Sequence, residues 1–88
     1  MAWTVQVIAD AEKELSKIPP DQQEMIRRAF DRMKESPFWG NMRALKGKEW
    51  KGVYRRTVGR YRVFFIPFHD KQTVRVVSIR LRTEKTYR

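Results

Sequence analysis

The stretch from Trp50 to Phe68, WKGVYRRTVGRYRVFFIPF, constrains the fold most, because it is typical of two β-strands joined by a tight turn. A two-residue connection containing glycine, between β-branched and aromatic residues, is the usual signal of a β-hairpin. We place the turn at Val58-Gly59, which sets Arg55 directly opposite Arg62 on one face. Like charges in that relation destabilise a sheet, so the pattern indicates a face that holds an anion.

Two helices are predicted before the hairpin. A short strand over Trp3–Ile8 leads to Asp10, which could cap a helix running to about Lys17. Pro19-Pro20 ends that helix, because proline cannot donate to a helical ladder. A second helix begins at Pro20 or Asp21 and continues to roughly Glu35, with apolar side chains at helical spacing.

The remaining segments complete an α+β domain. Phe38–Glu49 is interpreted as a loop that carries Leu45 into the core, and His69–Gln72 as a polar turn. Pro67 is expected at the end of the second hairpin strand, unless that strand lies at a sheet edge. Thr73–Leu81 is predicted as the last strand. The predicted order is β-α-α-β-β-β, with a helical hairpin packed on a small, largely antiparallel sheet. Residues 1–88 are expected to form a single domain.

Charge indicates the class of partner. Lys and Arg number 20 against 10 Asp and Glu, for a net charge of +10, and residues 49–88 hold eleven of the basic residues but three acidic ones. An arginine-rich basic half favours nucleic acid as the partner. The alternatives are a solubilising surface and a surface neutralised by an acidic protein.

The sequence lacks the residues that several kinds of catalytic and metal sites require. The chain has no Cys, no glycine-rich phosphate loop and no carboxylates at metal-ligand spacing, so we expect neither metal nor cofactor. His69, the only histidine, is interpreted as a solvated turn residue. No signal-peptide pattern and no apolar run of about 20 residues occurs, which predicts a soluble cytoplasmic protein without membrane contact.

What remains is a group of cations with a tyrosine. Lys51, Arg55 and Arg62 come from the hairpin. Arg80 and Arg82 come from the last strand, where alternation places them with Ser78 and Val76. Such a cluster could bind a phosphodiester and stabilise the charge of a pentavalent transition state. RNA supplies its own nucleophile, the 2′-OH, so no metal or protein nucleophile is required. Tyr87 could act as general acid or base, or could anchor the C-terminus. The predicted RNA-binding residues are Lys51, Arg60, Arg80 and Lys85.

The segments LKGKEWKGVYRRTVGRYRVFF and VRVVSIRLRTEKTYR resemble the RelE/ParE superfamily of bacterial and archaeal toxins. The matching features are Leu45-Lys46-Gly47, Arg55 before the turn, the run from Gly59 to Val63, and Arg82 followed by Tyr87. The resemblance covers nearly the whole chain. It implies a toxin that is neutralised by a cognate antitoxin. In the RelE branch, such toxins are metal-independent endoribonucleases that cleave mRNA in the ribosomal A site.

The resemblance also assigns roles to four candidate catalytic residues. Arg62 would bind the phosphate and stabilise the transition state, and Arg55 occupies the place of a catalytic lysine. Arg82 would orient the phosphate or the leaving group, and Tyr87 would assist the 2′-OH and stack on a base. Val53 departs from the pattern, since another family lysine falls there, and Lys51 is the nearest substitute. A ParE-like gyrase inhibitor and a catalytically weakened RNA-binding relative remain alternatives.

Overall fold

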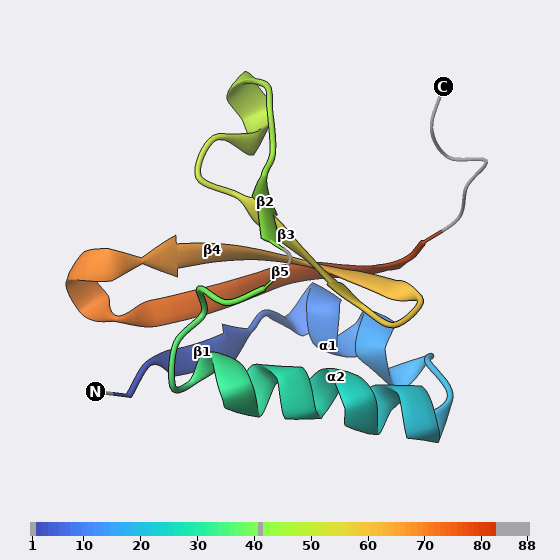
Figure 1. Cartoon of the computed structure of the whole chain (residues 1–88). Coiled ribbons are helices and arrows are strands. Elements are labelled where there is room, and N and C mark those ends of the chain that lie inside the picture. The colour runs from blue at the N-terminus through green and yellow to red at the C-terminus, as the bar shows by residue number, and fades with distance from the viewer. Residues whose placement is uncertain (1, 41, 83–88) are drawn as a thin grey trace.

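The computed structural model describes residues 2–40 and 42–82, in which two helices cover one face of a five-stranded sheet (Figure 1). The elements are β1 Thr4–Val7, α1 Ala9–Ser16, α2 Pro20–Met33, β2 Met42–Ala44, β3 Tyr54–Val58, β4 Tyr61–Phe68 and β5 Thr73–Leu81, with 3-10 turns at Lys48–Trp50 and His69–Lys71. The predicted α+β class and the order β-α-α-β-β-β are confirmed, and the short strand β2 is an addition to it. No described helix is both long and apolar enough to cross a membrane.

The strands lie in the order β1-β5-β4-β3-β2, so the hairpin strand β4 is at the centre of the sheet. Only the pair of β1 and β5 is parallel among the described strands; the others are antiparallel. Pro67 is the next-to-last residue of β4, as its missing N–H requires.

The core lies between the helices and the sheet. Leu15 of α1 and Ile26 and Met33 of α2 are fully buried against Val63 and Phe65 of β4. Because side chains alternate along a strand, the residues between these strand positions point to the opposite face, which the two described helices leave largely uncovered (Figure 1). We call this the open face. Of the two helices, α1 borders it, beside Ser78 and Arg80 of β5.

The pairing of the two hairpin strands is shifted by two residues from the predicted register. Val58 pairs with Tyr61, so the turn is Gly59-Arg60, and Arg62 lies opposite Thr57. The prediction that Arg55 and Arg62 are direct neighbours is therefore wrong. Val58 stays in the strand because its side chain packs in the core, and Gly59 takes the left-handed conformation with φ +58°.

A bulge in β5 corrects a second prediction. Phe64 pairs with Ser78 but Phe65 pairs with Val76, which leaves Val77 as an extra residue. Val76 is fully buried under the helices, whereas Ser78 and Arg80 lie on the open face. Val76 thus does not share a face with them, as simple alternation predicted.

Three local predictions fail for physical reasons. Asp10 lies inside the first turn of α1, and the N-cap is Ile8, which makes no side-chain hydrogen bond. Leu45 is only half-buried at the end of β2, and Met42 packs against the core instead. The first hairpin strand begins at Tyr54 rather than Trp50, because Gly52 at φ +83° breaks the alternation.

Candidate functional site

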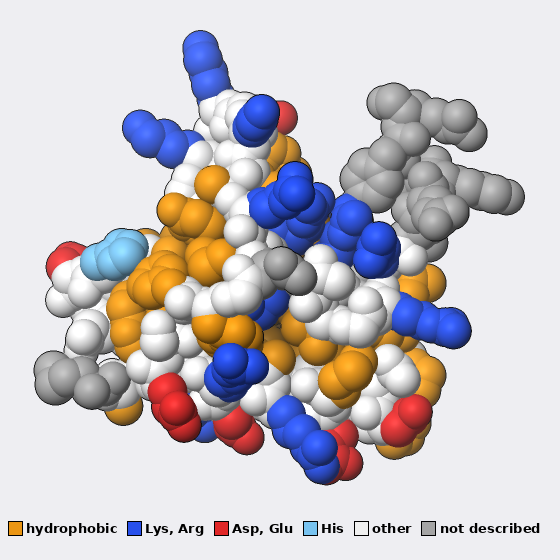
Figure 2. Space-filling view, in the orientation of Figure 1, with side chains coloured by type: hydrophobic (Ala, Val, Ile, Leu, Met, Phe, Trp, Pro, Cys, Tyr) orange, Lys and Arg blue, Asp and Glu red, His pale blue; other side chains and the backbone are white. Residues whose placement is uncertain are grey.

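Four arginines from different parts of the sheet line one hollow on the open face. The hollow measures about 540 Å³, and its lining residues are Gly40, Met42, Arg43, Arg55, Thr57, Arg62 and Arg82. We call it the arginine hollow. Among the described residues, no carboxylate contributes to this lining. Figure 2 shows Lys and Arg side chains gathered on the upper side of the molecule, while acidic side chains lie mostly around the helices below. The hollow is therefore a site of concentrated positive charge.

Strand pairing explains how the arginines meet. Arg43 of β2 is the register partner of Arg55 of β3, so both project from adjacent positions. Arg62 of β4 pairs with Thr57, two residues beyond Arg55, and is therefore a diagonal neighbour of Arg55 on the same face. The turn prediction was wrong, but an error of two residues keeps every side chain on its face, so Arg55 and Arg62 still converge.

Arg82 reaches the hollow from the end of β5. Its backbone N–H donates a hydrogen bond to the carbonyl of Arg60 at 2.7 Å, which holds the chain beside the β3–β4 turn. Partial burial, together with the positive charges of Arg55 and Arg82, lowers the pKa of Arg62. Because Arg55, Arg62 and Arg82 line the same hollow, their guanidinium groups could act together on one anion.

Three of the predicted RNA-binding residues, Lys51, Arg60 and Arg80, do not line the arginine hollow. Lys51 is exposed in the loop that follows the 3-10 turn, and Arg60 is exposed in the β3–β4 turn. Arg80 is on the open face, where it pairs with Arg62, but it lines a neighbouring hollow. Tyr87 and Lys85 lie outside the described residues.

Sequence reasoning missed Arg43, because Phe38–Glu49 was interpreted as a loop. The three-residue strand β2 that presents it is too short to show an alternating pattern. Val53, the position that departs from the resemblance, is buried at 7% exposure and belongs to no strand. Lys51 does not line the hollow, so it does not replace there the family lysine that is missing at position 53.

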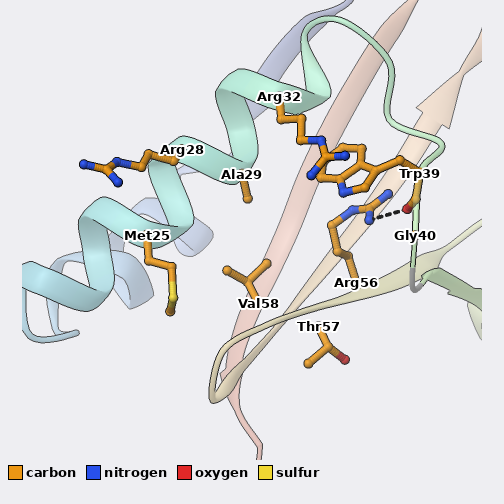
Figure 3. Close-up of a pocket in the computed structure, with 9 residues that line it drawn as sticks. All are labelled: Met25, Arg28, Ala29, Arg32, Trp39, Gly40, Arg56, Thr57 and Val58. Atoms are coloured by element: carbon orange, nitrogen blue, oxygen red, sulfur yellow. Dashed lines mark hydrogen bonds between the residues drawn. The ribbon is translucent and has the colours of Figure 1, made fainter.

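Arg56 supports the loop that forms one wall of the hollow. Its guanidinium is 3% exposed and donates from Nη1 to the carbonyl of Trp39 at 2.6 Å and from Nη2 to the carbonyl of Pro37. It also lies 3.6 Å from the centre of the Trp39 ring, and the guanidinium of Arg32 lies 4.5 Å from the same ring (Figure 3). Burial and the charge of Arg32 lower the pKa of Arg56 to about 10, so it remains a cation at neutral pH.

This stack borders a second cavity of about 440 Å³ between α2 and β3, which shares Gly40 and Thr57 with the arginine hollow. Arg56 thus fixes Trp39 and, through it, the position of Gly40. This role cannot be predicted from the pattern of residues, because a buried arginine in a strand is indistinguishable by pattern from an exposed one.

The chemistry open to the arginine hollow is the binding of a phosphate group. Planar guanidinium groups match phosphate with paired hydrogen bonds and remain charged. Converging cations in a hollow favour the extra negative charge of a phosphoryl transition state more than the ground state. Neither a histidine nor a tyrosine contributes to the described lining. Among residues 2–40 and 42–82, no group of three or more His, Cys, Asp or Glu could hold a metal ion.

One family model matches the chain. The profile of the family described as "ParE toxin of type II toxin-antitoxin system, parDE" matches residues 1–86. No curated protein matches the sequence at a significant level.

Solved structures of toxins share the fold. The chain is similar to a chain of the RelBE2 toxin–antitoxin complex of Mycobacterium tuberculosis, with a TM-score of 0.81 and 22% identity over 93% of this chain and 100% of that one. It is similar to a chain of the archaeal RelE–RelB complex of Pyrococcus horikoshii, with a TM-score of 0.82 and 19% identity over 96% and 99% of the two chains. The isolated RelE toxin of E. coli gives a TM-score of 0.77 and 21% identity over 94% and 87%.

Proposed function

The chain belongs to the ParE toxin family of type II toxin–antitoxin systems, and we propose that it is an endoribonuclease that cleaves mRNA in the ribosomal A site without a metal. The observation that carries the proposal is the convergence of Arg55, Arg62 and Arg82 on one hollow whose described lining contains no carboxylate. Three arginines that converge in this way suit the paired hydrogen bonds of a phosphate group.

In the proposed reaction, the 2′-OH of a nucleotide attacks the adjacent phosphorus. The new bond between the 2′-oxygen and phosphorus gives a 2′,3′-cyclic phosphate, and the bond to the 5′-oxygen of the next nucleotide breaks. One proton leaves the 2′-OH and one is delivered to the departing 5′-oxygen. The pentavalent transition state carries an additional negative charge, which the arginines stabilise.

Each described arginine has a proposed role in this reaction. Arg62, the most enclosed by like charges, binds the non-bridging oxygens of the phosphate. Arg55 and Arg82, on either side, stabilise the attacking and leaving oxygens. Arg43, the register partner of Arg55, adds to the field of the hollow. For Tyr87 we propose the proton transfer at the 2′-OH.

We propose a cognate antitoxin as the protein partner, because the similar structures include toxin–antitoxin complexes. Residues 49–88 carry eleven basic and three acidic side chains, so the surface of the antitoxin that covers them is expected to be acidic. Its affinity would then fall as salt screens the attraction.

A ParE-like inhibitor of gyrase is the second candidate, and the family profile itself favours it. The burial of Val53 and the placement of Lys51 outside the hollow favour a third, a relative that binds RNA but cleaves it weakly.

Two assays in parallel separate these functions. The proposal predicts that the purified protein arrests translation in a reconstituted system and leaves gyrase supercoiling unchanged, and that Arg62→Ala abolishes the arrest. Arg75→Ala removes a cation on β5 outside the arginine hollow and serves as the control that keeps activity. Inhibition of supercoiling by the wild type and by Arg62→Ala alike would replace the proposal with the gyrase function.

A further inference from the structure

A second hollow on the open face is built from aromatic rings and lies beside the arginine hollow. It measures about 300 Å³ and is lined by Trp50, Phe64, Ser78 and Arg80. We call it the Trp50 hollow. The ring centroids of Trp50 and Phe64 are 6.2 Å apart at an interplanar angle of 33°. Trp50 is 43% exposed, although burying an aromatic side chain is normally favourable.

The position of Trp50 is fixed by its loop. Its backbone N–H donates to the carbonyl of Gly47 at 3.2 Å, and its own carbonyl accepts from the N–H of Val53 at 3.0 Å. Between β2 and β3 the chain rises above the sheet on the side away from the helices (Figure 1). The indole is thus held over the open face by backbone hydrogen bonds, without being enclosed by the core.

The floor of the hollow is also ordered. The carboxylate of Glu14 on α1 accepts hydrogen bonds from the N–H of Ile79 at 2.9 Å and from Oγ of Ser78 at 3.3 Å. Nε of Arg80 donates to the same Oγ at 3.1 Å. These contacts fix Ser78 and Arg80 at the floor of the Trp50 hollow, with the carboxylates of Glu14 and Asp10 on its α1 side.

The two hollows are adjacent in the sheet. Arg62 of the arginine hollow and Phe64 of the Trp50 hollow are two residues apart on β4, which separates their Cα atoms by about 7 Å. Arg62 pairs with Arg80 and Phe64 pairs with Ser78, so cations and aromatic rings form neighbouring rows across β4 and β5. A nucleotide places a phosphate and a flat base at this kind of separation.

We propose that the Trp50 hollow holds one unpaired RNA base, stacked on Trp50 and Phe64, next to the phosphate in the arginine hollow. This inference rests on the proposed function and deepens it. Proteins that bind single-stranded nucleic acid combine a cationic path for the backbone with aromatic side chains on which bases stack. Stacking on Trp50 accepts every base, so it supplies affinity and position without sequence specificity.

The test is an abasic scan of a short single-stranded RNA. Each fluorescein-labelled oligonucleotide carries 2′-O-methyl groups, so that it cannot be cleaved, and one abasic position that moves along the series. Fluorescence anisotropy gives the dissociation constants for the wild type, Trp50→Ala and Trp50→Phe. Phe38→Ala is the matched control, because Phe38 is 40% exposed but packs on His69 and Trp3, away from both hollows.

For the wild type, one abasic position is expected to weaken binding by about 5- to 150-fold, the range reported for one stacked base. That difference disappears in Trp50→Ala, persists in Trp50→Phe and is unchanged in Phe38→Ala. The salt dependence of binding stays the same in Trp50→Ala but becomes shallower in Arg62→Ala, since only the latter removes a phosphate contact.

Two results overturn the inference and are distinct from each other. If the wild type binds the RNA and Trp50→Ala retains the full abasic penalty, stacking on Trp50 is refuted while the proposed function stands. If the folded wild type does not bind the RNA, or shows no abasic penalty at any position, the base site is refuted, while the proposed function is tested separately by cleavage on ribosomes. Loss of antitoxin binding by Trp50→Ala with unchanged RNA binding would identify the hollow as a protein-docking surface instead.

Discussion

Replacing Arg56 by methionine tests whether a buried cation without a carboxylate partner stabilises this fold. Methionine keeps the unbranched stem and removes the guanidinium, which donates to two carbonyls and stacks on Trp39. Two hydrogen bonds from a charged donor contribute about 3–6 kcal/mol, and a desolvated cation–π contact adds about 2 kcal/mol. Against this, a buried charge costs several kcal/mol in desolvation. We expect Arg56→Met to lower the free energy of unfolding by about 2–4 kcal/mol.

Arg32→Met is the matched control for this substitution. Arg32 lies over the same indole at 4.5 Å but is exposed, so its removal is expected to cost about 0.5–1 kcal/mol. Urea denaturation followed by far-UV circular dichroism gives both values, provided that the m-values agree. Equal costs for the two variants, or an Arg56→Met protein more stable than the wild type, would refute the argument that the guanidinium holds the loop.

Three further substitutions or additions test the site and its support. In differential scanning fluorimetry, inorganic phosphate should raise the melting temperature more than chloride of equal ionic strength does. At 100 times its dissociation constant, phosphate should raise the free energy of unfolding by about 2.7 kcal/mol. Arg62→Ala should remove most of that gain, whereas Arg75→Ala should keep it. Glu14→Ala should cost about 1–2 kcal/mol in urea unfolding because it leaves the N–H of Ile79 without its acceptor, whereas Glu12→Ala, which removes an exposed ion pair with Arg27, should cost less than about 1 kcal/mol. Gly59→Ala and Gly40→Ala should each cost about 1–2 kcal/mol in the same assay, because both glycines are left-handed. A Cβ at Gly59 overlaps only Cε of Met25, the movable end of that side chain, while one at Gly40 meets nothing, so a clearly higher cost at Gly59 would show that Met25 cannot move aside.

The larger elements of the fold were predictable because their sequences carry periodic signals. The apolar stripe predicts α2, Pro19-Pro20 predicts the break between the helices, and alternation predicts the strands. The turn was misplaced because Val58 and Arg60 flank Gly59 symmetrically in the sequence, and only core packing of Val58 decides between them. Alternation also cannot foresee the bulge at Val77, since an inserted residue leaves no mark in composition.

The candidate site was partly predictable for a related reason. Arg55 and Arg62 were found because a like-charged pair in a hairpin is conspicuous, and their convergence survived the error in register. Arg43 and Arg56 were missed because their surroundings depend on the loop between α2 and β3, whose strand β2 is too short to show a period. Trp50 was assigned to a strand, and only the tertiary structure shows that its loop holds it above the open face.

Primer extension on mRNA bound to purified ribosomes tests the central claim most directly. Wild type, Arg62→Ala and the control Arg75→Ala are compared at equal concentration, after circular dichroism has shown that all three are folded. The account predicts cuts confined to the A-site codon for the wild type and Arg75→Ala, ending in a 2′,3′-cyclic phosphate, and their loss in Arg62→Ala. Uncut mRNA with the folded wild type, or equal cutting by Arg62→Ala, would contradict it.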